Sequence, residues 1–253
     1  MSQLDGKVAI VTGAARGLGR AYAEAMAREG AAIFACDINS CDDTVAAIVA
    51  EGGRAAGAIT DIASMDSCTA MAQQAVDAYG RIDVLVNNAA LYAGLQGARF
   101  ENLDEAQWDA VMNINVKGLW QSCKAVVQPM RDAGGGSIIN ISSLAAVYGL
   151  PYGLDYVASK AAVIGMTRGM ARELGQDRIR VNAVAPSAVM TEGTEDFFGE
   201  KLEKAKKVIA AWQLIQRNLE TCDLTGTIIY LASDNSAFVT GQTHMVDGGS
   251  WFL

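Results

Sequence analysis

A tyrosine and a lysine four residues apart are the residues of this chain whose types and spacing most directly suggest chemistry. Tyr156 and Lys160 stand in the segment YVASK. Positions i and i+4 share one face of a helix, and an ammonium beside a phenol is expected to lower the tyrosine pKa from about 10. Such a tyrosine can exchange a proton near neutral pH. For the pair alone, a packed ring beside a solvated ammonium is the commoner arrangement.

Composition limits the machinery that can accompany this pair. The chain has 253 residues, a net charge of −8, 51% hydrophobic and 19% charged residues. These values favour a globular protein and argue against nucleic acid or an anionic membrane as its partner. The single histidine, His244, is too few for a His-rich zinc site, so we expect no metal. With five scattered cysteines, no signal-peptide pattern and no long apolar run, we expect a cytoplasmic protein with reduced thiols.

Short β-branched runs alternate with longer amphipathic segments along the chain. We expect strands at 7–12, 31–37, 54–60, 82–88, 137–143, 179–185 and 243–247, and helices at 17–29, 40–51, 64–79, 104–132, 154–175 and 220–232. Right-handed crossovers between such elements give a parallel sheet covered by helices on both faces. No repeat or linker divides the sequence. We therefore predict one α/β domain over residues 1–253, a Rossmann-type, doubly wound parallel β-sheet.

A glycine-rich loop, TGAARGLG at 12–19, joins the first expected strand to the first expected helix. Its glycines let backbone N–H groups approach a pyrophosphate at the helix N-terminus, although a plain structural turn would use the same residues. Asp37 ends the second strand about 20 residues later, where an acid binds the ribose of NAD. A carboxylate there repels the 2′-phosphate of NADP, whereas Arg16 would attract it. Giving Asp37 the greater weight predicts NAD(H) over NADP(H), unless Asp37 only caps the next helix.

With these pieces the chain resembles the short-chain dehydrogenase/reductase family over essentially its whole length. The matching motifs, in order, are TGAARGLG, Asp61-Ile62, NNAA (87–90), NINVKG (113–118), INISS (139–143), YVASK, PSAVMT (186–191) and VDGG (246–249). The resemblance implies a catalytic set of Asn115, Ser143, Tyr156 and Lys160. Ser143 is preferred to Ser142 because the family's serine lies 13 positions before its tyrosine.

The resemblance also implies which residues hold the cofactor and how the reaction runs. The implied cofactor contacts are Gly13, Arg16, Gly17, Leu18, Gly19, Asp37, Asp61, Ile62, Asn88, Tyr156, Lys160, Val189 and Thr191. Tyr156 would exchange the proton of the alcohol while hydride passes to or from the nicotinamide, and Ser143 would orient the substrate oxygen. Asn115 would hold a water that relays protons to Lys160. Ala90 and Ser187 depart from the family, which usually has glycine at both positions.

The substrate end is expected to be apolar. Segment 192–217 interrupts the strand pattern after the nicotinamide contacts and is the expected lid, with aromatic and aliphatic side chains in DFF (196–198) and VIAAWQLI (208–215). Ser143, Leu95, Tyr148, Leu150, Tyr152 and Ser187 are the expected substrate contacts. The lid lysines, at 201, 204, 206 and 207, are typical of a solvated helix face. Alternatively, the aromatic residues serve only lid or subunit packing.

The predicted function is an NAD-dependent oxidoreductase that interconverts a secondary alcohol and a ketone, on a small hydrophobic or aromatic substrate. Two segments, APSAVMTEGTE and LTGTIIYLASD, are similar to those of dehydrogenases of small aryl alcohols such as phenylethanol. A 3-oxoacyl thioester reductase and a sugar, polyol or steroid dehydrogenase stay open, and so does a non-catalytic nucleotide-binding protein. The family resemblance implies a homotetramer, in which the apolar end SWFL (250–253) would be covered.

Overall fold

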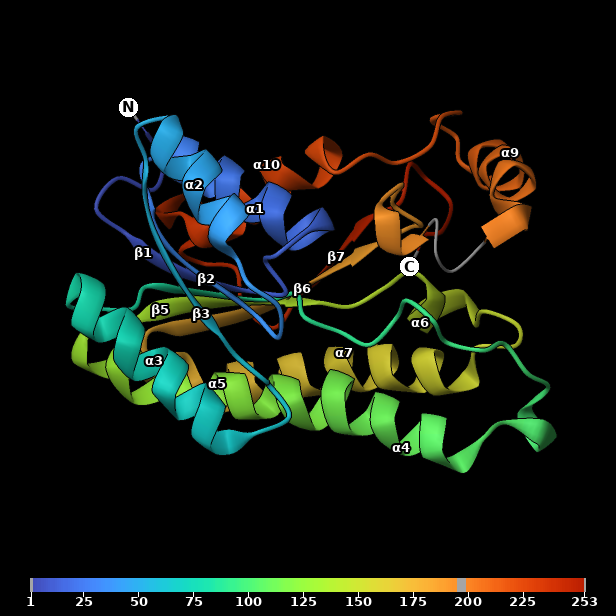
Figure 1. Ribbon diagram of the computed structural model, residues 1–253, viewed down its shortest axis with the longest axis horizontal. Helices are drawn as coiled ribbons and strands as arrows, with labels where there is room; N and C mark the ends of the chain where they lie inside the picture. The colour runs from blue at the N-terminus through green and yellow to red at the C-terminus, as the bar shows by residue number, and fades with distance from the viewer. Residues whose placement is uncertain (1, 195–198, 253) are drawn as a thin grey trace.

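The computed structural model describes residues 2–194 and 199–252, and within them seven parallel strands form one sheet (Figure 1). Their order is β3-β2-β1-β4-β5-β6-β7. The strands are β1 (Val8–Thr12), β2 (Ala32–Asp37), β3 (Arg54–Ile59), β4 (Val84–Asn87), β5 (Gly136–Ile141), β6 (Ile179–Pro186) and β7 (Thr243–Val246). The order reverses between β1 and β4, and ligands of such sheets bind in the crevice beyond the carboxyl ends of the strands.

Helices cover both faces of this sheet, so the predicted doubly wound α/β fold is confirmed. On one side lie α1 (Gly17–Arg28), α2 (Asp42–Ala50) and α10 (Cys222–Ala232); on the other lie α3 (Met65–Tyr79), α5 (Leu119–Asp132) and α7 (Leu154–Leu174) (Figure 1). The helices α4 (Glu105–Met112), α6 (Ala145–Tyr148) and α9 (Leu202–Trp212) lie toward the carboxyl ends of the strands. None of the helices in the described residues is long and apolar enough to cross a membrane.

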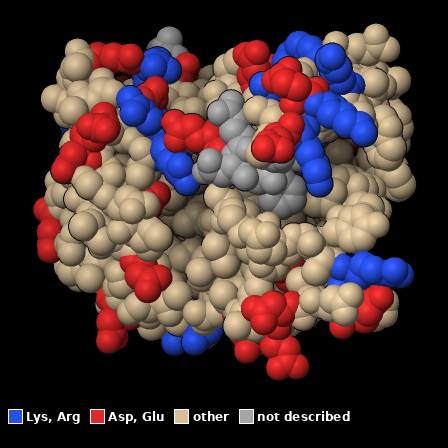
Figure 2. Space-filling view, turned by 45° about the vertical axis from the view of Figure 1, so that its right-hand side comes forward, with Lys and Arg blue, Asp and Glu red and all other residues tan. Residues whose placement is uncertain are grey.

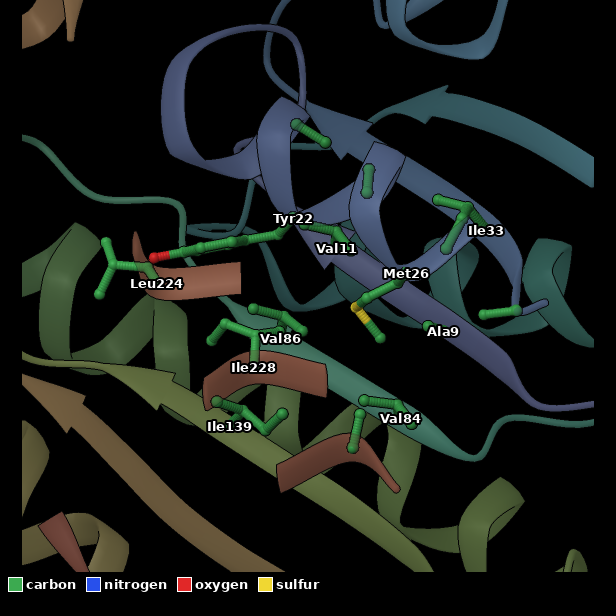
Figure 3. Packing of buried hydrophobic residues seen from close by; sticks show 14 of the residues in the cluster. Ala9, Val11, Tyr22, Met26, Ile33, Val84, Val86, Ile139, Leu224 and Ile228 are labelled. Atoms are coloured by element: carbon green, nitrogen blue, oxygen red, sulfur yellow. The ribbon is translucent and has the colours of Figure 1, made fainter. Parts of the chain in front are cut away.

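Two apolar clusters hold the layers together, one on each face of the sheet. Successive strand residues point to opposite faces, so Ala9 and Val11 of β1 belong to the cluster under α1 and α10, whereas Ile10 belongs to the cluster over α3, α5 and α7. Figure 3 shows Tyr22 and Met26 of α1 packed against this first face, with Ile228 of α10 beside them. Burial on both faces explains why the strands are continuous apolar runs.

Two local features differ from the sequence expectation, and both shape the site. The helix expected at 104–132 contains one π-helical turn, Asn113–Gly118, between α4 and α5. A π turn adds a residue to the helix and re-aims its side chains. The strand expected at 137–143 ends at Ile141: the Ser142 N–H still donates to the Val184 carbonyl oxygen at 2.8 Å, and Ser143 then starts a short turn that leads to α6. The catalytic candidates Asn115 and Ser143 are therefore carried by irregular backbone.

Candidate active site

One cavity of about 690 Å³ runs along the carboxyl ends of the strands, from the glycine loop to α9. Its lining contains most of the residues singled out from the sequence: Gly13, Arg16, Gly17, Leu18, Asp37, Asp61, Ile62, Asn88, Ser143, Tyr148, Leu150, Tyr156, Lys160, Ser187, Val189 and Thr191. Gly19, Asn115, Leu95 and Tyr152 do not line it. The cavity has two ends, one bounded by the glycine loop and β2 and the other by α7 and the lid segment.

The glycine loop is built so that side chains are excluded from it. A Cβ at Gly19 would lie 2.0 Å from the carbonyl oxygen of Gly13, and a Cβ at Gly13 would lie 2.8 Å from Asn88 Nδ2. Gly13 and Gly17 also have positive φ angles, +68° and +58°, which favour glycine. Gly19 thus does not line the cavity itself, but its lack of a side chain lets the first turn of α1 pack directly on the glycine loop.

The first turn of α1 is free of side-chain caps. Its N-cap residue, Arg16, makes no capping hydrogen bond, and no acidic residue stands in the first turn. By contrast, Ser64 caps α3 and Asp104 caps α4 through their side-chain oxygens. Uncapped N–H groups at a helix N-terminus that borders a cavity suit the pyrophosphate of a dinucleotide. The loop therefore fits the cofactor that the sequence predicts.

Asp37 closes this end of the cavity from the last position of β2. Its carboxylate accepts hydrogen bonds from the Ala15 N–H, at 3.2 Å, and from the Asn39 N–H, at 3.0 Å. It therefore ties the glycine loop to the strand while lining the cavity. Arg16 forms an ion pair with Glu192 at 3.5 Å, at the start of the lid segment. Asp37 is therefore bonded to the glycine loop itself, whereas the Arg16 side chain pairs with the start of the lid segment.

The expected adenine and ribose contacts are positioned by the ends of β3 and β4. Asp61 accepts a hydrogen bond from the Ala63 N–H at 2.9 Å, and Ile62 is buried beside Gly118. Asn88 donates through Nδ2 to the carbonyl oxygens of Thr12, at 3.0 Å, and Gly13, at 3.1 Å. Asn88 therefore holds β1 and the glycine loop against β4, in addition to lining the cavity.

Val189 and Thr191 follow β6 and join the cavity wall to the lid. Val189 forms a parallel bridge with Leu219, and its carbonyl oxygen accepts from Thr194 Oγ1 at 2.6 Å. The hydroxyls of Thr191 and Thr194 lie 3.3 Å apart. These bonds fix the start of segment 192–217 at the middle of the cavity, next to the catalytic candidates.

Tyr156, Ser143 and Lys160 meet where the cavity passes the ends of β5 and α7. Lys160 Nζ lies 5.8 Å from the centroid of the Tyr156 ring, as the i, i+4 spacing predicts. Ser143 forms a side-chain hydrogen bond with Tyr156. The neighbouring Ser142 is buried and donates its hydroxyl to the Lys160 carbonyl oxygen at 2.8 Å. The structure thus separates the two serines that spacing alone leaves equivalent.

The electrostatics of this group differ from the sequence expectation. Burial raises the pKa of Tyr156 to about 12, although its hydrogen bond with Ser143 works in the opposite direction. Burial also lowers the pKa of Lys160 to about 8. Desolvation disfavours the charged form of each group, and Lys160 directs its ammonium to the Ile141 carbonyl oxygen at 2.9 Å. In the protein alone, burial therefore dominates the pKa of the phenol and raises it, contrary to the sequence expectation.

Asn115 lies behind this group, in the π turn, and its amide is engaged on both sides. Its Oδ1 accepts from the Leu91 N–H at 2.7 Å, and its Nδ2 donates to the Leu91 carbonyl oxygen, at 3.1 Å, and to Ser159 Oγ, at 3.2 Å. The side chain thus pins the loop after β4 to the helix α7 that carries Tyr156. A role in a water relay stays a prediction.

The substrate end matches the expected residues only in part. Tyr148, Leu150 and Ser187 line the cavity, but Leu95 and Tyr152 border a separate space of only about 10 Å³. The reason is local backbone pairing: the Ala98 N–H donates to the Tyr152 carbonyl oxygen at 3.1 Å, and Tyr152 has a φ of +65°. This turn leaves the Tyr152 side chain largely exposed.

Tyr92 is a cavity residue that sequence reasoning missed. Its ring lies 5.2 Å from the Tyr156 ring, centroid to centroid, with 45° between the planes. Its hydroxyl forms a side-chain hydrogen bond with Thr194, and burial raises the Tyr92 pKa. Its position, four residues after Asn88 in a loop that leaves the sheet's carboxyl edge, was the signal that could have found it. Tyr92 therefore joins Tyr156 to the lid segment.

The lid segment contributes an apolar wall through α9. Ala205, Val208, Ile209 and Trp212 line the cavity, and Trp251 lines it from the chain's end. The expected aromatic contacts at 196–198 lie outside the described residues. The lid lysines stand on the outer side with acidic neighbours: Lys206 pairs with Glu203 at 3.1 Å, and Figure 2 shows basic and acidic side chains intermingled on this face.

Comparison with known proteins finds relatives over nearly the whole chain. Residues 13–250 match a family model described as enoyl-(acyl carrier protein) reductase. The chain is 40% identical to a 3-oxoacyl-acyl-carrier-protein reductase of Thermotoga maritima, over 98% of both chains. It is 38% identical to a D-threitol dehydrogenase of Mycolicibacterium smegmatis, over 98% of this chain and 94% of that protein. The crystal structure of levodione reductase matches with a TM-score of 0.92 and 28% identity, over 97% of each chain.

A single-domain, dinucleotide-binding α/β fold with a Tyr–Lys pair at its cavity defines a class of oxidoreductases. The chain belongs to the short-chain dehydrogenase/reductase family, whose enzymes use nicotinamide cofactors. The relatives named above are a 3-oxoacyl-acyl-carrier-protein reductase, a D-threitol dehydrogenase and a levodione reductase, so their names point to different substrates. Family membership thus shows that the chain is an oxidoreductase, but it does not identify the substrate, which must be inferred from the residues that line the cavity.

Proposed function

We propose that this protein is an NAD-dependent oxidoreductase that interconverts a small hydrophobic or aromatic secondary alcohol and its ketone. The observation that carries the proposal is the contact of Tyr156 with Ser143 and Lys160 in one cavity that extends to Asp37. Tyr156 is the proton donor and acceptor for the substrate oxygen, and Ser143 orients that oxygen. The ammonium of Lys160 supplies a positive charge near the buried Tyr156 phenol. When bound, the cofactor would supply or accept the hydride, and its oxidised form would also carry a positive charge that favours the phenolate form of Tyr156.

That positive charge matters because of the pKa values in the protein alone. Burial holds Tyr156 protonated, with a pKa of about 12, so proton acceptance from an alcohol needs an added electrostatic contribution. Lys160, with its pKa lowered to about 8, keeps its proton over most of the neutral range. The protein alone is therefore set for proton donation, and the oxidation direction is expected to depend more strongly on a charged cofactor.

The NAD preference rests on Asp37. Its carboxylate lines the cavity at the end of β2 and accepts two backbone N–H groups. Those bonds fix it in place, where its charge opposes a 2′-phosphate and its oxygens can accept from a ribose hydroxyl. Arg16 is paired with Glu192, which offsets its attraction for a phosphate.

The direct test is NADH absorbance after mixing the protein, NAD⁺ and a panel of aryl, acyl, sugar and steroid secondary alcohols. Tyr156→Phe removes the transferable proton but preserves the ring, so we expect turnover to fall by ~10²-fold or more. NADH binding, measured by fluorescence, should change little. Near-normal turnover in this variant would refute the proposed mechanism.

A second candidate function is reduction of 3-oxoacyl thioesters. The similarity to a 3-oxoacyl-acyl-carrier-protein reductase favours it. This second function would be preferred over the first if the kcat/KM for an acetoacetyl thioester exceeds the kcat/KM for every compact ketone tested. The apolar wall made by α9 and the place of Asp37 favour the first function.

We further propose that the chain acts as a cytoplasmic homotetramer. Phe252 is largely exposed at the end of the chain, and β7 is the last strand of the sheet. Burial of such groups against a second copy would remove apolar surface from water. Light scattering at micromolar concentration tests this assembly, and a monomeric mass would contradict it.

A further inference from the structure

The segment that follows α9 has an inverted pattern of burial. Gln213 is only 3% exposed, whereas its neighbours Trp212, Leu214 and Ile215 are 70%, 73% and 60% exposed. This is the reverse of the usual arrangement, in which apolar side chains are buried and polar ones are exposed. Because burying a polar group is costly unless it is hydrogen-bonded, the Gln213 amide should have a partner. The chain turns here so that the amide alone points inward.

The amide of Gln213 is held by the ends of two strands. Its Nε2 donates to the hydroxyl of Ser187, directly after β6, at 3.1 Å, and the two side chains are buried. Its Oε1 lies over the turn after β7, where a Cβ added at Gly248 would come within 2.9 Å of it. The Ile215 N–H donates to the Gly248 carbonyl oxygen at 3.0 Å. The carboxyl end of the lid segment is thereby fastened to the sheet.

Each member of this pair keeps one unused hydrogen-bonding group. Ser187 Oγ accepts from Gln213, so its O–H remains as a donor, and Gln213 Oε1 remains as an acceptor. Within residues 2–194 and 199–252, no hydrogen bond engages either group. Because Ser187 and Gln213 both line the main cavity, these two groups are presented to whatever the cavity holds.

The pair stands next to the reacting end of the cavity. Ser143 follows β5 and Ser187 follows β6, and the Leu144 N–H donates to the Pro186 carbonyl oxygen at 2.8 Å between them. Adjacent strands lie about 4.8 Å apart. This strand spacing is the basis on which we place an oxygen bound at Ser187 one or two carbons from an oxygen bound at Ser143.

We propose that Ser187 and Gln213 form a specificity pair that binds a second oxygen of the substrate, carried one or two carbons from the reacting carbon. This inference rests on the proposed function and narrows its substrate class to compact apolar secondary alcohols that bear a neighbouring hydroxyl, and to the matching hydroxy ketones. Ser187 donates to that oxygen, and Gln213 accepts from its hydrogen. The pair positions the substrate and takes no part in proton or hydride transfer.

The test compares matched substrates with and without the second hydroxyl. The substrate pairs are 1-phenylethanol with 1-phenylethane-1,2-diol, and butan-2-ol with butane-2,3-diol, each oxidised with NAD⁺. We expect the wild type to favour the diol of a pair by ~10-fold in kcat/KM, the scale of one to two hydrogen bonds. Ser187→Ala and Gln213→Leu should each bring this ratio close to one, mainly through KM for the diol.

Three controls separate recognition from simple damage. The double variant, Ser187→Ala with Gln213→Leu, leaves no unpaired polar partner in the wall, so it should remain folded and show the same lost preference. Gln74→Leu makes the same change at an exposed position of α3, remote from the cavity, and should leave the ratio unchanged. Thermal melting of every variant checks its folding.

Two outcomes would overturn the inference. Equal losses for the diol and the mono-alcohol would show that the pair only fastens the lid. A wild type that does not favour either diol would show that no second oxygen is recognised, while turnover of the mono-alcohols would still support the proposed function. If none of the four alcohols is oxidised, the proposed substrate class fails, and the specificity pair fails with it.

Discussion

The two ends of the cavity are built from different kinds of groups. At the glycine loop, backbone makes the surface: a Cβ at Gly19 would strike the Gly13 carbonyl, and the first N–H groups of α1 have no side-chain cap. At the lid, side chains make the surface, with Ile209 and Trp212 from α9 opposite Tyr92 and Tyr156. A surface made of backbone suits a ligand that does not change, such as the cofactor. A surface made of side chains can change its shape through single substitutions, as a substrate pocket does.

The polar groups of the two ends are also used differently. Asp37 and Asn88 bond to the backbone of the glycine loop or its neighbours, so they position the wall as well as line it. At the substrate end, Ser187 and Gln213 bond to each other across two segments. A substitution at the cofactor end is therefore expected to disturb the fold and binding together, and one at the substrate end mainly selectivity.

The largest effect at the cofactor end should follow from Asp37→Ala. It removes both the repulsion of a 2′-phosphate and the oxygens offered to the ribose. We expect the NADH to NADPH ratio of kcat/KM to fall by ~10-fold or more, as for loss of a charged hydrogen bond. Asp37→Asn is the control, because it removes the charge and keeps one oxygen for the Ala15 N–H, although it loses the second oxygen, which accepts from the Asn39 N–H. A wild type that prefers NADPH would show that Arg16 dominates.

A smaller effect tests whether backbone packing defines this end. Gly19→Ala should lower the free energy of unfolding by about 1–3 kcal/mol, the cost of overpacking, and weaken NADH binding. Gly226→Ala, in the exposed middle of α10 where a Cβ meets nothing within 4 Å, should instead stabilise by about 0.5–1 kcal/mol. Urea unfolding measures both. An equal change in the free energy of unfolding for Gly19→Ala and Gly226→Ala would mean that the glycine loop has room for a side chain.

The next test concerns the buried lysine, Lys160. Burial lowers the Lys160 pKa from its usual 10.5 to about 8. Between these values the unfolded chain binds more protons than the folded protein, so stability should rise with pH from about 8 toward 10.5. Lys160→Met should lack this rise when melting temperatures are compared from pH 7 to pH 9.5. An identical pH dependence in the variant would show that the lysine is not desolvated.

Much of the fold could be predicted because its signals are local. In β4, Val84 and Val86 are apolar on one face of the sheet and Leu85 is apolar on the other, and such a continuous apolar run predicts a buried parallel sheet directly. The bounds of α1, α3 and α7 agree within a residue or two with those expected. The π turn at Asn113–Gly118 could not be predicted, because it depends on the bonds of Asn115 to Leu91.

The cavity residues divide in the same way. Gly13, Asp37, Ser143, Tyr156 and Lys160 follow from motifs with fixed spacing, and the structure brings them to one cavity. Leu95 and Tyr152 were expected there only because their loops leave the same end of the sheet, and backbone pairing between Ala98 and Tyr152 turns them aside. Loop direction does not determine where a side chain points.

The sequence by itself determined the fold and the family, and it supplied the set of candidate catalytic residues, because periodicity and motif spacing are properties of short segments. Only the tertiary structure decided the electrostatic state of Tyr156, since desolvation depends on all the groups packed around it. It also decided that Tyr92 lies against Tyr156 and that Gln213 reaches Ser187. These contacts join residues that are distant in the sequence, so only the packing of the folded chain brings them together in space.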